Sequence, residues 1–493
     1  MRGTPYLLAW RQTVSDCSSP SGAGWQPVRQ ADATLVTQLA DDLARRIDEH
    51  GLRPGTRLPS IRRMAEQSGV SRFTVVEAYD RLVARGLVQS RHGAGFFVRA
   101  RSASLTALAS ARVPQAAPET PVRVDVSWLL RNMFRETAAG MPGGAGLLPP
   151  EWLDPDMVAA AVRAVGRTVR GNLVSYGSPQ GYAPLRQQLA SMLQADGVPA
   201  HPERNLLTTN GVTHGLDIVA RHLIKPGDTV LVEDPAWFVI FGRLAAFGAR
   251  PVGVPRGPDG PDLAMLDRLA AEHKPRLYII NGAVHNPTGH TLSAGAAYDI
   301  LRLAERHDFM VVEDDTYADL HPGGAMKLAA LDRLERVILV GGFSKMLAAS
   351  LRVGYIAAGA ETLQRLTDLK MLAGLTSPEL GERVVHRVLV EGQYQRHIER
   401  VRARVNEARL RSIQALQQLG LSVPHEPHAG MFVWADCGRD SEPVARNAAE
   451  RGMLLAPGTL FSPSGAPSTM LRFSVAMVDT PGIWQSIAAV MAQ

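Results

Sequence analysis

The strongest constraint on the fold is a series of short apolar runs that recurs from about residue 126 to the end of the chain. The runs are residues 229–234 (TVLVED), 277–281 (LYIIN), 310–314 (MVVED), 336–340 (RVILV) and 353–357 (VGYIA). Amphipathic helical stretches separate them. Strand–helix alternation over such a length indicates a largely parallel sheet flanked by helices. We therefore expect an α/β main domain at residues 126–493.

A different pattern precedes this region, at residues 34–101. It is helical at first, and residues 60–88 divide at Gly69 into two short helical stretches. Ser71 can cap the second helix, in which Val75, Tyr79 and Leu82 form an apolar face. Two short helices around a glycine turn predict a helix-turn-helix. Residues 87–99 (LVQSRHGAGFFVR) then predict two short strands around a tip, a wing, so the domain is α+β.

Arginine is concentrated in the same region. Residues 34–101 hold twelve arginines against seven Asp or Glu, nearly all of the net charge of +6. Such a concentration is typical of phosphate contact, although a solvated helical surface can also carry it. The second helix leaves Arg72, Phe73 and Thr74 exposed at its N-terminus, where a recognition helix meets base edges. Arg62 can reach the DNA backbone, and the wing tip presents Arg91 and His92.

The motifs RPGTRLPS (53–60), GVSRFTVVEAYDRL (69–82) and RHGAGFFV (91–98) make residues 34–101 resemble the winged helix-turn-helix of the GntR family. The resemblance implies binding of double-stranded DNA. The DNA-binding residues that we predict are Arg62, Ser71, Arg72, Thr74, Arg91, His92 and Gly93. Phe73 departs from the family pattern, which usually has a small polar residue there, and this departure bears on base preference.

One lysine stands out in the main domain. Lys345 follows the strand RVILV and the turn GGFS. Covalent chemistry on a carbonyl needs an amine held partly out of water, because only the neutral form attacks. Taken alone, a lysine after a strand is more often structural. The four other lysines, which have polar or turn-forming neighbours, are expected on the surface: Lys225, Lys274, Lys327 and Lys370.

Other residues near strand ends favour a pyridoxal cofactor. Asp314 ends one strand, three residues before Tyr317, and such a cofactor needs a carboxylate at its ring nitrogen and a phenol at its ring oxygen. A metal-binding or helix-capping acid pair is the alternative, but no companion cluster supports a metal. Asn286 lies in HNPTG, which could be only a turn. Trp237 could stack on a flat ring or lie in the core.

Two further segments contain hydrogen-bond donors that can bind anionic groups. In NGVTHGL (210–216), Val212 and Thr213 begin a helix after a strand and leave free N–H groups for a phosphate. In MLRFSV (470–475), Arg472 lies in an apolar strand, where an unpaired guanidinium is unfavourable. A substrate carboxylate would be a bidentate partner, and a fixed salt bridge is the alternative.

Together, in one order, these motifs resemble the class I/II, fold-type I pyridoxal-phosphate aminotransferases. The motifs are YGSPQG, TNGVTHGL, EDPAW, HNPTG, EDDTYADL, FSK, LRVGY and LRFS. The resemblance implies pyridoxal 5'-phosphate as cofactor, a small α/β domain after the main sheet, and the following roles: Lys345 forms the internal aldimine; Asp314 pairs with the ring nitrogen; Asn286 and Tyr317 bond the phenolic oxygen; Trp237 stacks on the ring; Val212, Thr213, Ser344 and Arg352 hold the phosphate; Tyr176 reaches the phosphate of a partner subunit; Arg472 binds the substrate carboxylate.

One position departs from this family. Gly342 stands where a Ser or Thr is usual, three residues before the lysine. The departure removes one phosphate hydrogen bond, worth about 0.5–1.5 kcal/mol net.

A GntR-type domain ahead of an aminotransferase-like domain is similar to the layout of the MocR/GabR group of bacterial regulators. The resemblance covers about residues 34–493. It implies a homodimeric transcriptional regulator that senses an amino compound with a carboxylate or similar anion, or the cofactor itself, through an aldimine at Lys345. The alternative is a working aminotransferase that carries a DNA-binding domain, because Lys345, Asp314 and Arg472 are all present.

The remaining features complete the expected organisation. Residues 1–33 are rich in Ser, Gly, Pro and Gln and are expected to be disordered, and residues 102–125 are expected to form a linker. Apolar runs are too short for a membrane span, and the N-terminal one is too short for a secretory signal. Cys17 and Cys437 show no disulfide or zinc spacing, which favours a cytoplasmic protein.

Overall fold

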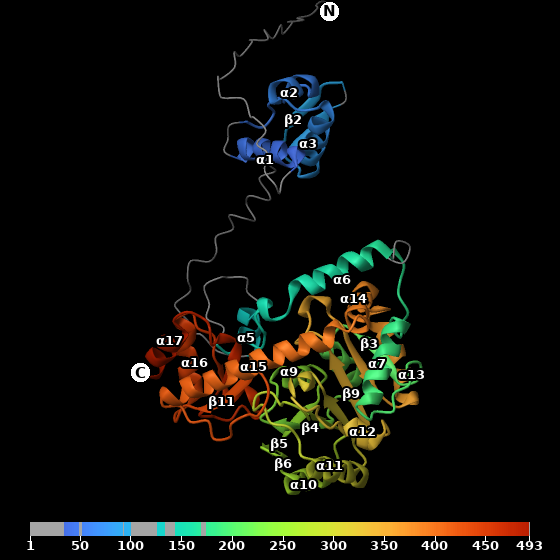
Figure 1. Cartoon of the computed structure of the whole chain (residues 1–493), viewed down its shortest axis with the longest axis vertical. Helices are drawn as coiled ribbons and strands as arrows, with labels where there is room; N and C mark the ends of the chain where they lie inside the picture. Colours follow the sequence, from blue (N-terminus) through green and yellow to red (C-terminus); the bar gives the residue numbers. More distant parts are fainter. Residues whose placement is uncertain are drawn as a thin grey trace, which may run out of the picture. The chain divides into compact units, whose positions relative to one another are not determined.

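The computed structural model describes residues 34–48, 52–91, 93–99, 126–133, 143–168 and 174–492. The chain divides into two compact units, Met1–Thr120 and Pro121–Gln493 (Figure 1). The extension expected at residues 1–33, the linker expected at 102–125 and His92 lie outside the described residues. Within those described, no helix is long and apolar enough to cross a membrane.

The first unit is a helix-turn-helix followed by a two-stranded wing, as predicted. Its elements are α1 (Leu35–Asp48), α2 (Ile61–Ser68), α3 (Arg72–Ala84), β1 (Val88–Arg91) and β2 (Gly95–Val98), with β1 and β2 antiparallel. Gly69 ends α2 in the left-handed conformation, with φ of 63°, and Ser71 caps α3 by accepting from the Thr74 N–H. Val75 and Tyr79 are fully buried on the inner face of α3. The cap and the apolar residues of α3 thus determine which face of the helix is exposed to solvent.

The second unit is built on an eight-stranded sheet in the order β3-β10-β9-β8-β7-β4-β5-β6. The strands are β3 (Leu206–Thr209), β4 (Thr229–Asp234), β5 (Arg250–Gly257), β6 (Gly260–Pro261), β7 (Leu277–Ile280), β8 (Met310–Asp314), β9 (Val337–Gly342) and β10 (Gly354–Ala357). The five strands from β9 to β5 are mutually parallel, as predicted. β10 is antiparallel to both neighbours, which the sequence pattern did not indicate. Only residues 343–353 join it to β9, too few for the helical crossover that a parallel pair needs.

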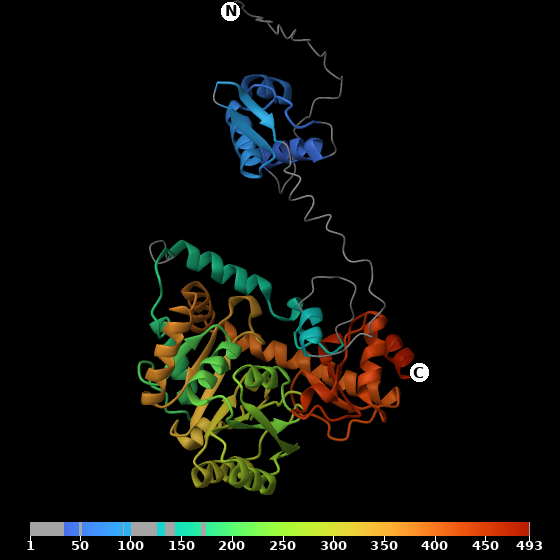
Figure 2. The same ribbon diagram turned by 180° about the vertical axis from the view of Figure 1, so that it is seen from behind.

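Helices cover both faces of this sheet, which is why its strands read as continuous apolar runs. The helices are α6 (Pro155–Thr168), α7 (Ala183–Ala195), α8 (Val212–Leu223), α9 (Val239–Ala246), α10 (Leu263–His273), α11 (Ala294–His307), α12 (Leu328–Asp332), α13 (Ala360–Gly374) and α14 (Glu379–Val390), whereas α5 (Val126–Met133) packs in a separate cluster with Leu454 and Phe461. Val230 and Val232 pack in one core with α8, α9 and α13. Leu231, between them, packs in the other with α7, α10 and α11. Figure 2 shows the sheet and its helices from behind.

A smaller α/β region ends the chain. It contains the antiparallel strands β11 (Phe432–Asp436), β13 (Met470–Ser474) and β12 (Ala456–Pro457), in that order, with α16 (Ser441–Glu450) and α17 (Ile483–Met491). The long helix α15 (Gln393–Gln418) runs from the large sheet to this region (Figure 1). Arg472 lies on the central strand β13, opposite Trp434 and Ala456. From this strand the Arg472 guanidinium reaches Asn286, in the loop that follows β7.

Candidate cofactor and ligand site

A cavity of about 580 Å³ lies at the carboxyl ends of the parallel strands. Ligands of open α/β sheets bind at this edge, because the loops that follow the strands meet there. Its lining includes ten of the predicted site residues: Val212, Thr213, Trp237, Asn286, Asp314, Tyr317, Ser344, Lys345, Arg352 and Arg472. The structure thus brings together side chains that are up to 260 positions apart in the sequence. Tyr176 is not part of this lining and is 82% exposed.

Lys345 has the surroundings of a reactive amine. Its Nζ donates to the carbonyl oxygen of Gly146 at 2.7 Å. Burial, together with the charges of Arg472 and Arg352, lowers the pKa of Lys345 to about 8, and the charge of Asp314 opposes this shift. A substantial neutral fraction of this amine therefore exists just above neutral pH, and the neutral form is the nucleophile.

Asp314 is held at the end of β8 by its own loop. Its Oδ1 accepts from the backbone N–H of Thr316 at 3.0 Å and from the Thr316 hydroxyl. Burial raises the pKa of Asp314, while the bonds from Thr316 and the charge of Lys345 oppose this. A carboxylate in this position suits a cationic ring nitrogen, because a buried charge needs a charged or hydrogen-bonding partner.

Asn281 ties the Asp314 and Asn286 loops together, and the sequence analysis missed it. Its Nδ2 donates to the Asp314 carbonyl at 2.6 Å, and its Oδ1 accepts from the Asn286 N–H at 2.9 Å. Its own N–H donates to Glu233 Oε2 at 2.7 Å. The available signal was its position as the last residue of LYIIN, at the same sheet edge as Asp314.

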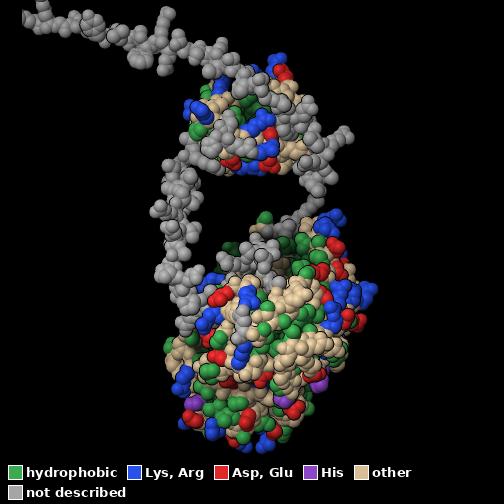
Figure 3. All heavy atoms as spheres, turned by 90° about the vertical axis from the view of Figure 1, so that its left-hand side faces the viewer, with side chains coloured by type: hydrophobic (Ala, Val, Ile, Leu, Met, Phe, Trp, Pro, Cys, Tyr) green, Lys and Arg blue, Asp and Glu red, His purple; other side chains and the backbone are tan. Residues whose placement is uncertain are grey.

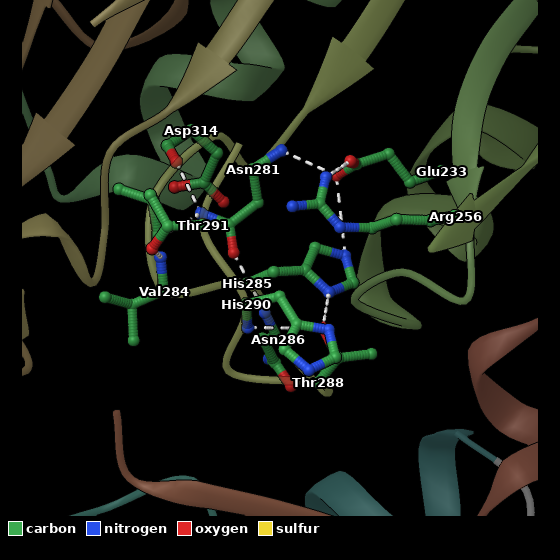
Figure 4. A network of polar contacts seen from close by, with 11 residues as sticks. Glu233, Arg256, Asn281, Val284, His285, Asn286, Thr288, His290, Thr291 and Asp314 are labelled. Carbon is green, nitrogen blue, oxygen red and sulfur yellow. Dashed lines mark hydrogen bonds and ion pairs between the residues drawn. The ribbon is translucent and has the colours of Figure 1, made fainter. Parts of the chain in front are cut away.

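Beneath Asn281 lies a buried polar network, drawn in Figure 4. Glu233 forms a short ion pair with Arg256, and His285 Nε2 lies 3.4 Å from Glu233 Oε2. His285 Nδ1 lies 2.9 Å from the Thr288 hydroxyl. Burial holds the pKa of His285 well below its usual value, so this ring is neutral at pH 7. These contacts hold in place the turn that carries Asn286.

One end of the cavity is rich in donors for an anion. Helix α8 begins directly after Gly211, whose φ of 81° favours glycine. Arg352 donates to Ser344 Oγ at 3.0 Å and to the Asn210 carbonyl at 3.1 Å. A Cβ on Gly211 would lie 2.5 Å from Arg352 Nη2, so glycine makes this approach possible. Free N–H groups at the helix start and the guanidinium together suit a phosphate.

Gly342 borders the same end, where the related family usually has a hydroxyl. A Cβ there would lie 3.2 Å from Val212 Cγ2, 3.2 Å from the Val353 carbonyl oxygen and 3.3 Å from Gly354 Cα. These contacts are tight, and two of them involve backbone. The close pairing of β9 with β10 at Gly342 and Gly354 therefore favours glycine at this position.

Arg472 lies at the opposite end and is only 2% exposed. Its Nη1 donates to Asn286 Oδ1 at 2.9 Å and its Nη2 to the Gly144 carbonyl at 2.6 Å. The guanidinium carbon lies 4.3 Å from the ring centre of Phe432 and 5.0 Å from that of Phe461. Burial lowers the pKa of Arg472 to about 10, so the group stays charged at pH 7. No acidic side chain among the described residues pairs with it, so the alternative of a fixed salt bridge finds no support there.

The residues around the cavity fit pyridoxal phosphate. Its phosphate, its ring nitrogen and its aldehyde need a donor cluster, a carboxylate and an amine, and all three line one cavity. Tyr317 is buried and shares a side-chain hydrogen bond with Asn286, where a ring oxygen would find both groups. Trp237 adds a flat apolar wall. The chemistry of this donor set therefore agrees with the predicted cofactor.

Two of the lysines expected on the surface are buried, and that prediction was wrong. Lys327 is 5% exposed and pairs with Asp315 at 2.7 Å. Lys370 is 1% exposed, and its Nζ lies 3.4 Å from the Thr208 hydroxyl, beside Glu382. Burial lowers the pKa of Lys370 to about 8, as for Lys345. Their polar partners are distant in sequence or come from other elements, so neighbouring residues gave no sign of burial.

The predicted DNA-binding residues that the structure describes are exposed or half-exposed on the first unit, whose surface carries arginine side chains, blue in Figure 3. Arg72 is exposed and has no polar partner among the described residues. Arg62 pairs with Glu66 at 3.1 Å. Arg91 lies over the Phe97 ring at 4.8 Å, and Gly93, with φ of 71°, forms the wing turn.

Ser71 and Thr74 also occupy this surface, but both hydroxyls take part in the cap of α3. Their oxygens lie 2.8 Å apart. Their positions at the start of α3 agree with a recognition helix that enters DNA by its first turn.

Comparisons with known protein families agree with both units. The family described as aminotransferase class I and II matches residues 149–489. The family described as bacterial regulatory proteins, gntR family, matches residues 35–98.

Curated relatives include both enzymes and regulators. A 2-aminoadipate transaminase of Thermus thermophilus is 34% identical over 382 residues, which cover 74% of this chain and 93% of the relative. An uncharacterized HTH-type transcriptional regulator of Bacillus subtilis, YisV, is 25% identical over 92% of this chain and 94% of its own. The probable rhizopine catabolism regulatory protein MocR of Rhizobium meliloti is 29% identical, covering 76% of this chain and 75% of its own.

A solved structure shares the fold of the second unit. LysN, an α-aminoadipate aminotransferase from Thermus thermophilus, matches with a TM-score of 0.67 at 29% identity. The match covers 74% of this chain and 94% of LysN, which is complexed with N-(5'-phosphopyridoxyl)-L-leucine.

Proposed function

The chain belongs to the class I and II aminotransferase family and, with its GntR-type domain, to the MocR-type regulators; from this premise we propose that it senses an amino compound at Lys345 and reports the binding to DNA. Pyridoxal phosphate is its cofactor. The observation that carries the proposal is the partly buried amine of Lys345, which faces one cavity with Asp314 and an Arg472 that has no acidic partner among the described residues.

Each residue has a distinct part in this proposal. Bound pyridoxal phosphate supplies a carbonyl that captures amino groups and a ring that withdraws electrons. Lys345 would hold the cofactor through that carbonyl, and its pKa of about 8 lets its amine give or take a proton near neutral pH. Asp314 would hold the ring nitrogen, and the donors at Arg352, Ser344 and the start of α8 would hold the phosphate.

Arg472 selects the ligand by its anionic group. A guanidinium that is surrounded by aromatic rings is poorly hydrated, so a carboxylate can bind it with two hydrogen bonds at little loss of water. To reach it, the carboxylate exchanges with the bond from Arg472 to Asn286 Oδ1. The bond from Arg472 uses only Oδ1, so Asn286 Nδ2 would remain a donor for the cofactor's ring oxygen, and the ligand and cofactor contacts meet at one residue.

A homodimer completes the proposal. Tyr176 is 82% exposed and Val174 91% exposed, and the backbone of Gly177 lies against Glu379 at the start of α14. Leu375 and Leu380, beside Glu379, are also more than 40% exposed. An apolar surface of this kind is typical of a subunit interface, and it would bring Tyr176 to the partner's cavity.

A working aminotransferase is the second candidate, because Lys345, Asp314 and Arg472 are all in place and enzymes are among the relatives. The two candidates separate in one experiment on the purified chain with added pyridoxal phosphate. DNA that the protein selects from a random library is titrated with and without a panel of amino acids, and the same mixtures receive a keto acid. A change in DNA affinity without turnover supports the regulator. Turnover that leaves DNA affinity unchanged supports the enzyme and contradicts the regulator.

A further inference from the structure

Phe73 is an exposed aromatic side chain on the outer face of the recognition helix. It is 70% exposed, whereas Val75, Ala78, Tyr79 and Leu82 on the inner face of α3 are fully buried. No aromatic or cation–π contact involves it among the described residues. Single exposed apolar residues are common on proteins, so exposure alone carries no function. Its position at the start of the helix and the charged residues around it do indicate a function.

Phe73 is the second residue of α3, directly after the cap at Ser71. In a helix-turn-helix, the first turn of the second helix is the part that contacts base edges. Arg72 precedes it, and Arg63 on α2 is also exposed; neither side chain has a polar partner among the described residues. These free guanidinium groups complement phosphates on either side of a groove.

The charge along α3 limits how deeply the helix can enter. Glu77 and Asp80 follow Phe73 by four and seven positions, so they lie on the same face, and both are exposed. Carboxylates on this face repel phosphates. The positive first turn is therefore the part that enters the major groove, and Phe73 is its most exposed apolar group.

The major groove offers one apolar group to such a side chain, the C5 methyl of thymine. A wedge between stacked bases would need a minor-groove approach, which the recognition helix does not make. We propose that Phe73 reads a thymine by contact with its C5 methyl, and so sets base preference at one position of the DNA site. The inference rests on DNA binding by the first unit and is independent of what the cofactor site does.

The test uses the full chain and duplexes selected by it from a random library. Each thymine is replaced in turn by deoxyuridine, which removes only the C5 methyl, and affinity is measured by fluorescence anisotropy. Loss of one buried methyl contact, at about 0.8 kcal/mol, corresponds to about fourfold weaker binding. We expect this loss at one thymine position of the recognised sequence, while other replacements have little effect.

Variants assign the effect to the side chain. F73S should bind thymine and deoxyuridine duplexes equally, and Phe73→Leu, which keeps an apolar contact, should retain the preference. Val83→Ser, a change at an exposed residue on the last turn of α3, is the matched control and should behave as the parent chain. A parent chain that is indifferent to every thymine replacement overturns the proposal, even where F73S binds too weakly to be titrated. An unchanged thymine preference in F73S overturns it as well.

Discussion

The two units expose their functional groups in opposite ways. In the DNA-binding unit, Arg72 and Phe73 face solvent and form no polar or aromatic contact with described residues. In the cofactor unit, Arg472 is buried and Lys345 is partly buried, and removal from water shifts the pKa of each downward. A surface that reads a long polyanion needs free charges, whereas a site for one small molecule needs charges whose reactivity is tuned by removal of water. The comparison predicts that a substitution in one unit leaves the affinity of the other unit for its ligand intact while the substituted unit has no ligand bound, because coupling acts through bound ligands.

The largest effect is expected from Lys345→Ala. It should abolish the borohydride-fixed attachment of pyridoxal phosphate, because no other lysine lines the cavity. Mass spectrometry after reduction measures this directly. Affinity of the cofactor-free protein for its selected DNA should not change.

Lys370 supplies the control for that experiment. It is 1% exposed and burial also lowers its pKa to about 8, but it does not line the cavity. Lys370→Met should keep the attachment. If it loses the attachment while remaining folded, a low pKa and not the cavity's geometry decides which lysine reacts, and our account of the site is wrong.

Arg72→Ala tests the exposed unit. Removal of a contact to a base or phosphate should weaken DNA binding about fivefold to 140-fold, since such contacts are worth about 1–3 kcal/mol. Anisotropy titrations at fixed salt measure it, and the cofactor spectrum should not change. Arg85→Ala is the control, because Arg85 pairs with Asp41 inside the unit at 2.6 Å. Equal losses of DNA affinity in both variants would indicate that the DNA binds a different face of the first unit.

How much of the structure could be predicted from the sequence depends on how far apart the interacting residues lie along the chain. The helix-turn-helix could be predicted because caps, glycine turn and apolar face all lie within about 30 neighbouring residues, and the sheet because its strands are apolar on both faces. Contacts between segments that are far apart in the sequence could not be predicted. Arg472 meets Asn286 across 186 positions, and Lys370 meets Thr208 across 162. Asn281, which joins three loops, carries no motif of its own. The substitutions at Lys345, Arg72 and Arg472 test the roles predicted for these residues.

Arg472→Lys should weaken binding of carboxylate-bearing amines by about tenfold. Lysine keeps the positive charge but cannot form the two parallel bonds of a guanidinium, and a hydrogen bond to a charged group is worth about 1.5–3 kcal/mol. Spectral titration of the cofactor-loaded protein compares an amino acid with the amine that lacks its carboxylate. Equal weakening for both ligands would show that Arg472 supports the site's shape instead of binding the carboxylate.

The smallest effect concerns pH. Because burial lowers the pKa of Lys345 to about 8, its neutral fraction rises as the pH is raised through that value. Between pH 7 and pH 8 the neutral fraction, and with it the initial rate of cofactor capture by the cofactor-free protein, should rise about fivefold. Stopped-flow absorbance measures the rate. A profile that is flat in this range and rises only near pH 10 would mean that Lys345 is hydrated like an ordinary surface lysine.

The central claim is that the buried site and the exposed surface are coupled. Coupling between two ligands is reciprocal, so DNA must change the affinity for the amino compound by the same factor by which that compound changes the affinity for DNA. The direct measurement is a spectral titration of the cofactor-loaded chain with an amino acid that changes DNA affinity, in the presence and absence of saturating selected DNA. We predict equal factors in the two directions. An amino-acid affinity that is the same with and without DNA would contradict the account.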